Sequence, residues 1–189
     1  MPIPTDRSLT DTALDLLSRV TAMALDAEPV DGKLVRLLNE ARACLGRGPV
    51  DPPHARPSTD GNFTVATFFL FTPDRTELAI YLPQNFPPEQ ATLRIPAGYG
   101  HPGLVASTGE GLLLEDTRQH EGFVQILKTG RMGSAMFSPL RWAGEILGAM
   151  VNAAIQPGTY TRQDSRVHGI LANLAALLLG VRGSYPIGR

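Results

Sequence analysis

The sequence has almost no cysteine. Cys44 is the single cysteine among 189 residues, so one chain can form neither an internal disulfide nor a zinc site built from several thiolates. A reducing, cytoplasmic location is the simplest expectation from this composition. Cys44 falls on the apolar stripe of an expected helix, and we therefore interpret it as a buried structural thiol. A reactive cysteine would need an exposed, electropositive site.

The sequence also lacks a surplus of positive charge and a long apolar run. Lys+Arg 17 and Asp+Glu 18 leave a net charge of −1, which argues against nucleic-acid binding because neutralising phosphates requires basic residues. The longest apolar run, 174–179, is far shorter than the roughly 18–20 residues of a membrane span. The N-terminus has neither the basic nor the apolar region of a signal peptide. We expect no nucleic-acid partner and no membrane partner.

Known catalytic and metal-binding patterns are missing as well. No two histidines have metal-ligand spacing. The Gly-x-Ser-x-Gly motif is absent, and neither Ser107 nor Ser134 has an evident partner base in the sequence. The sequence therefore predicts no catalytic residue, no metal site and no resident cofactor.

The most distinctive stretch that is present is the glycine-rich segment 95–116. Gly98–Gly103 is a literal G-x-G-x-x-G, the pattern of dinucleotide-binding folds. That pattern should open a long helix within repeated βαβ units, but 107–111 breaks the chain within about two turns and no such repeat surrounds it. We interpret the glycines as a turn into a short helix that starts at Pro102. Its N-terminal N–H groups could face an anion.

Hydrophobic periodicity predicts helices at both chain ends with strands between them. The first helix is expected to begin at Ser8 in a capping box, and the second to be capped by Asp31. A capping box of Thr161 and Asp164 opens the last helix, whose apolar face runs from Val167 to Leu178. Strands are expected over 63–71, 78–82, 91–95, 112–116, 134–140 and 145–155, with a further helix over 121–128. This order indicates an α+β fold with one mostly antiparallel sheet.

An ordered set of motifs resembles one family. The glycine pattern at 93–109 is followed by Leu114-x-Asp116 and a helix that carries Phe123. Paired strands at 134–148 come next, and then the final helix from Thr161. No single motif is diagnostic. Together, from about residue 34 to 178, they resemble a GAF domain.

The resemblance implies a six-stranded antiparallel sheet of profilin-like (GAF/PAS) type. The N- and C-terminal helices would pack on one face, and the crossover with its short helix would close a small-molecule pocket on the other. It divides the chain into an N-terminal helical arm (1–30), a GAF domain (31–181) and a short tail (182–189). The ligand-binding residues that it implies are Tyr99, Gly100, His101, Gly103, Asp116, Phe123, Ser134 and Met136. For Asp116, an N-cap of the following segment is an equal alternative.

The resemblance also implies a function. GAF domains commonly sense a small organic ligand and dimerise through their terminal helices. Nothing of domain size lies outside the GAF region, so a signal would leave through a helix-mediated homodimer to a separate output protein. One alternative is a ligand-free dimerisation or scaffold module whose pocket is filled by side chains. Another is a degenerate relative of the GAF-type methionine sulfoxide reductases.

Family subtypes differ in residues that this chain lacks. The reductase branch needs several pocket cysteines, and covalent bilin attachment needs a cysteine near the crossover. Haem ligation would rest on His101 alone, and the better reading of that residue is structural. The Asn-Lys signature of cyclic-nucleotide-binding members is missing, because Asn152 and Asn173 are followed by Ala153 and Leu174. No enzymatic activity is therefore expected, and the ligand stays open.

Overall fold

The computed structural model describes residues 7–46, 63–120, 124–125, 131–182 and 186. Two short 3-10 turns, η1 (Pro88–Gln90) and η2 (Thr117–Gln119), accompany the main elements of this part of the chain. The helices are α1 (Arg7–Ala24), α2 (Val30–Cys44), α3 (Gly100–Thr108) and α4 (Arg162–Val181). The strands are β1 (Thr64–Phe71), β2 (Glu77–Gln84), β3 (Arg94–Pro96), β4 (Leu112–Leu114), β5 (Ser134–Trp142) and β6 (Glu145–Ala154).

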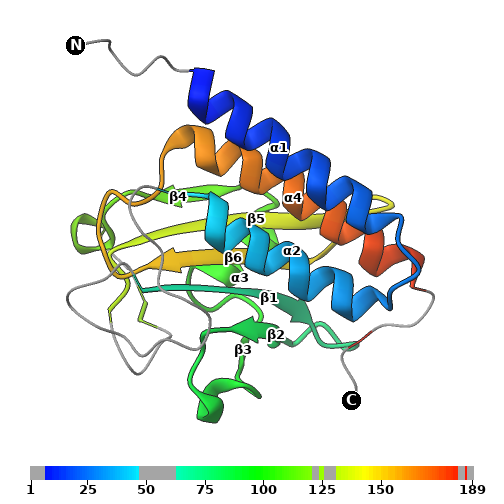
Figure 1. The fold of residues 1–189 in the computed structure, drawn as a ribbon. Coiled ribbons are helices and arrows are strands. Elements are labelled where there is room, and N and C mark those ends of the chain that lie inside the picture. Colours follow the sequence, from blue (N-terminus) through cyan, green and yellow to red (C-terminus); the bar gives the residue numbers. More distant parts are fainter. Residues whose placement is uncertain (1–6, 47–62, 121–123, 126–130, 183–185, 187–189) are drawn as a thin grey trace.

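The six strands form one sheet in the order β3-β2-β1-β6-β5-β4, and every neighbouring pair is antiparallel. Helices α1, α2 and α4 lie together on one face, whereas α3 lies on the other (Figure 1). The α+β fold with a six-stranded antiparallel sheet is therefore confirmed. No helix in the described ranges is both long and apolar enough to cross a membrane.

The central strands are buried on both faces. All eight residues of β1 are buried, as expected for a strand whose two faces are both apolar. Phe68 and Leu70 pack against the helices, whereas Val65 and Phe69 belong to the core on the α3 side. Each fully buried side chain of this kind contributes about 1.5–3 kcal/mol. The sheet thus supports two separate cores.

Close backbone approach explains the glycine in β6. Gly148 has φ +150, and a Cβ there would lie 1.9 Å from the carbonyl oxygen of Phe69. A glycine inside a strand often marks such a close backbone approach. The hairpin that joins β5 to β6 turns at Ala143-Gly144, where both residues have positive φ, as a type I′ turn requires.

Several predicted boundaries differ from the structure. Asp31 does not cap α2, because Pro29 is the N-cap. Instead Asp31 accepts hydrogen bonds from the Tyr81 hydroxyl (2.5 Å) and from the Arg182 guanidinium. α1 begins at Arg7, one residue before the expected Ser8.

Strand β3 and helix α3 also begin at positions that the sequence did not indicate. β3 covers Arg94–Pro96 rather than 91–95, because 88–90 forms a 3-10 turn. α3 starts at Gly100, two residues before the expected Pro102. The helix expected over 121–128 lies outside the described residues, apart from 124–125.

Candidate functional site

A small apolar cavity lies between the sheet and the start of α3. Its volume is about 50 Å³. Strands β1, β5 and β6 supply one wall, α3 supplies another, and Phe86, Val124 and Met132 complete the described lining. The lining residues are Val65, Phe69, Phe86, His101, Pro102, Val124, Met132, Ala135, Phe137, Val151 and Ala153.

His101 is the one ionisable side chain among the described residues that line this cavity. It is 5 % exposed, and its ring centroid lies 5.6 Å from that of Phe137 and 5.0 Å from that of His120. Burial lowers the pKa of His101, and the neighbouring His120 lowers it further. The imidazole is therefore neutral at pH 7, and the described lining carries no formal charge.

The glycines of the crossover serve its geometry. Gly100 has φ 63 and turns the chain into α3. A Cβ on Gly103 would lie 2.6 Å from the backbone of Gly98, so the helix can fold back this closely only with glycine there. Pro102 has no N–H, and the Gly103 N–H donates to the Tyr99 carbonyl (3.3 Å). Two of the first four positions of α3 therefore offer no donor to an anion.

Asp116 caps the 3-10 turn η2. Its carboxylate accepts from the Arg118 backbone N–H (3.0 Å), from the Arg118 guanidinium (two contacts of 2.8 Å) and from the Gln119 amide (3.0 Å). The hydrogen bonds from Arg118 hold the pKa of this carboxyl well below its usual range. Asp116 lines an open hollow of about 460 Å³ together with His120 and Arg162, outside the apolar cavity.

The other expected ligand residues lie elsewhere. Tyr99 is 47 % exposed. Ser134 donates to the Leu114 carbonyl (3.0 Å), and Met136 lies in the core on the helix side of the sheet. Phe123 lies outside the described residues. Among the expected residues that the structure describes, only His101 lines the cavity.

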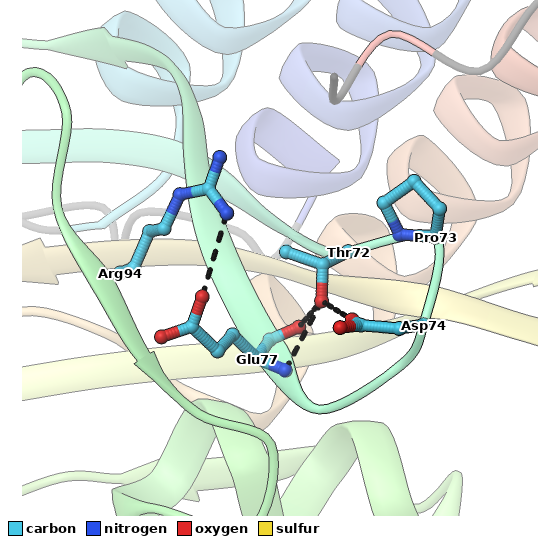
Figure 2. Close-up of a pocket in the computed structure, with 5 residues that line it drawn as sticks. All are labelled: Thr72, Pro73, Asp74, Glu77 and Arg94. Carbon is cyan, nitrogen blue, oxygen red and sulfur yellow. Dashed lines mark hydrogen bonds and ion pairs between the residues drawn. The ribbon is translucent and has the colours of Figure 1, made fainter. Parts of the chain in front are cut away.

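A polar hollow of about 430 Å³ lies at the turn between β1 and β2 (Figure 2). The Thr72 hydroxyl donates to the Asp74 carboxylate (2.6 Å), and Arg94 donates to Glu77 (3.4 Å). The hydrogen bond from Thr72 lowers the pKa of Asp74. The Arg75 N–H donates to the Thr72 carbonyl (2.8 Å), which closes the turn between the two strands. These contacts complete the turn, so we interpret the hollow as structural.

A buried chain of hydrogen-bonded side chains links α4 to the face of the sheet opposite the cavity. Ser138 Oγ lies 2.7 Å from His168 Nδ1, and His168 Nε2 lies 3.1 Å from Asn152 Oδ1. An amide oxygen only accepts, so Nε2 carries the proton and Nδ1 accepts from the Ser138 hydroxyl. His168 is 0 % exposed, and burial lowers its pKa from 6.5 to about 3.

Ser138, His168 and Asn152 are residue types that can serve as a nucleophile, a base and an orienting group. None of the three residues lines the cavity or the hollows described above, and all three are buried. A substrate therefore has no route to Ser138, and the chain joins α4 to β5 and β6 instead. The sequence could not reveal it, because only the register of the strands brings Ser138 and Asn152 to one side.

Comparison with known families agrees with this geometry. The family model for the GAF domain matches residues 33–179. The chain belongs to the GAF domain family. GAF domains are typically sensory modules for small ligands, and the apolar cavity lies within the matched range. No curated protein sequence matches the chain.

Solved structures of GAF domains share the fold at low identity. The GAF domain from an Acinetobacter phosphoenolpyruvate-protein phosphotransferase is 16 % identical, with a TM-score of 0.73 over 93 % of this chain and 96 % of that chain. The equivalent domain from Coxiella burnetii is 17 % identical, with a TM-score of 0.72 over 89 % and 92 %. The free methionine-R-sulfoxide reductase from Neisseria meningitidis is 14 % identical, with a TM-score of 0.69 over 96 % and 95 %. At these identities the likeness shows the fold alone.

His168 should make the stability of the domain depend on pH. Its pKa is lower in the folded state than in the unfolded chain, so below about pH 6.5 the unfolded chain takes up a proton that the folded state excludes. Between pH 6.5 and pH 5, this residue should lower the free energy of unfolding by about 2 kcal/mol. Urea denaturation at several pH values measures the change.

Two variants separate burial from hydrogen bonding in that experiment. His168→Gln removes the titrating group, and its free energy of unfolding should fall less with acidification than that of the wild type. Ser138→Ala removes a hydrogen bond but leaves the imidazole buried, so it should keep the wild-type pH dependence at lower overall stability. Equal pH dependence in wild type and His168→Gln would show that His168 is not the responsible group.

Proposed function

We propose that this chain is a sensory or regulatory GAF domain that binds a small organic ligand in the cavity between the sheet and α3. The observation that carries the proposal is the cavity itself, an apolar space that holds one buried neutral imidazole. Its position fits the proposal, because α3 covers the sheet there and the helices pack on the opposite face.

The volume of the cavity bears on the alternatives. Pockets for organic ligands usually measure about 300–1,000 Å³, whereas this one measures about 50 Å³. A ligand of that usual size would therefore have to displace part of the layer formed by α3 and its flanking residues over the sheet. The small volume also favours a second candidate function, a ligand-free scaffold module whose pocket is largely filled by its own side chains.

The position of Cys44 gives the reductase alternative no support. Cys44 lies at the end of α2 and packs at the edge of the helix-side core, across the sheet from the cavity. Arg19 lies 3.2 Å from its sulfur, but burial raises the pKa of the thiol. The described lining of the cavity therefore supplies no thiolate.

A homodimer through the terminal helices is the second part of the proposal. Ile170, Leu177 and Val181 are 50 %, 45 % and 60 % exposed, and their spacing puts them on one side of α4. α1, which lies beside α4 (Figure 1), exposes Leu14 by 59 %. Val167, Leu171 and Leu178, which belong to the same expected apolar face of α4, are buried. An apolar strip of this kind is typical of an interaction surface.

The proposed signal passes from the cavity through the helices to a separate output protein. α4 contacts the sheet directly behind the cavity wall, through the chain of Ser138, His168 and Asn152. A ligand can change the arrangement of the helices only if it binds two arrangements with different affinity.

Native mass spectrometry of the protein purified from its own host tests the ligand. The wild-type chain should carry an adduct of constant mass across preparations. Ala135→Val, which adds two carbons to the cavity wall, should lose it. The exposed Ser107→Ala on α3 serves as the control and should retain the adduct. If the wild type carries no adduct in repeated preparations, the scaffold function replaces the sensory one.

Light scattering tests the dimer. The variant Ile170→Glu/Leu177→Glu places charges on the exposed strip of α4, and we expect the apparent mass to halve while the helical circular dichroism stays unchanged. Leu178 is unsuitable for this test because it is buried, at 6 % exposed. Ser107→Glu, which adds one charge on the opposite face of the sheet, should leave the mass unaltered. A double variant with the mass of the wild type would place the interface elsewhere.

A further inference from the structure

We infer that the cavity takes a neutral, apolar small molecule of about the size of a single ring, and not a charged metabolite. This inference rests on the proposed sensory function and specifies the chemistry of its ligand.

The first argument is the absence of charge in the described lining. It consists of aliphatic, aromatic and methionine side chains, proline and one histidine, with no Asp, Glu, Lys or Arg among its described members. A carboxylate or phosphate placed there would lose its hydration without gaining a charged partner, which is strongly unfavourable in an apolar medium. Sites for such anions typically contain Arg or Lys.

The histidine does not change this conclusion. The ring of His101 is 5 % exposed, and burial keeps its pKa low. It therefore contributes a neutral polar ring next to Phe137, with 32° between the two planes. Aromatic rings attract one another in offset and edge-to-face arrangements, so a planar ring beside Phe69 and Phe137 would be favoured.

Charged groups near the site are directed elsewhere. Asp116 and Arg118 form an ion pair of 2.8 Å, and Asp116 lines the open hollow outside the cavity. Behind the wall, the helix-side core places the apolar Met136 and Met150, both 0 % exposed, next to the neutral chain of His168. No Asp, Glu, Lys or Arg among the described residues therefore lines the ligand space.

The volume of the cavity further restricts the class of ligand. A volume of about 50 Å³ corresponds to roughly three to five water-sized groups at about 10–15 Å³ each. A six-membered ring exceeds this volume far less than a nucleotide does, and Phe86, which lines the cavity, is only partly buried. A nucleotide would require the cover to be rebuilt.

Calorimetric titration of the full chain at pH 7.5 with phenol and with benzoate tests this inference, because the two probes share a ring and differ in charge. Phenol should bind the wild type at least about tenfold more tightly than benzoate. Ala135→Val should weaken phenol binding at least about tenfold, whereas Ser107→Ala should leave it unchanged. Ala153→Val, on the neighbouring strand, replaces Ala135→Val if the latter fails to fold.

Three results would overturn the inference. Benzoate could bind as tightly as phenol and respond to Ala135→Val, which would show that the cavity accepts charge while the sensory function stands. Phenol could bind the wild type with an affinity that neither Ala135→Val nor Ala153→Val changes, which would place its site elsewhere. The third result is that neither phenol nor benzoate binds, which would show that the cavity does not admit a ring. Failure of the sensory function itself appears separately, as the absence of any adduct in protein from the native host.

Discussion

Burial of the sheet on both faces is the constraint on which the rest of the structure depends. β1 has no exposed residue, and its neighbour β6 is fully buried from Gly148 to Ala154. Each face must therefore be covered by its own layer, the helices on one side and α3 with its flanking segments on the other. In the helix layer, His168 of α4 bonds to Ser138 of β5 and to Asn152 of β6. The α3 layer leaves a small apolar space.

The helix layer and the α3 layer pack on neighbouring residues of the same strands. These strands therefore connect the wall of the cavity to the helices. On β5, Phe137 lines the cavity and the next residue, Ser138, bonds to His168 of α4. On β6, Val151 lines the cavity and the next residue, Asn152, bonds to His168. Because successive residues of a strand point to opposite faces, a ligand that displaces the wall acts on strands that also hold α4. A neutral ligand suits this arrangement, since neither layer contributes a charge on a described residue to the cavity.

Much of the fold could be predicted from the sequence. The strand expected over 63–71 and the capping box of Thr161 and Asp164 are local patterns, and the structure confirms both of them. The candidate site was less predictable. Both faces of β5 are apolar enough to suit either layer, so Ser134 and Met136 could be assigned only once the strand register was known. Asp31 and Asp116 each stand at a helix start, and only the contacts show that Asp116 caps a turn whereas Asp31 bonds to Tyr81. The chain of Ser138, His168 and Asn152 comes from three elements and leaves no local pattern.

A crystal of the protein under xenon pressure tests the central claim most directly, because xenon enters apolar cavities without charge or hydrogen bonding. We predict an anomalous peak among Phe69, His101, Phe137 and Val151, and a much weaker peak in Ala135→Val. A wild-type crystal with no xenon at that place, or with ordered water bonded to polar groups there, would contradict the account of an apolar ligand site.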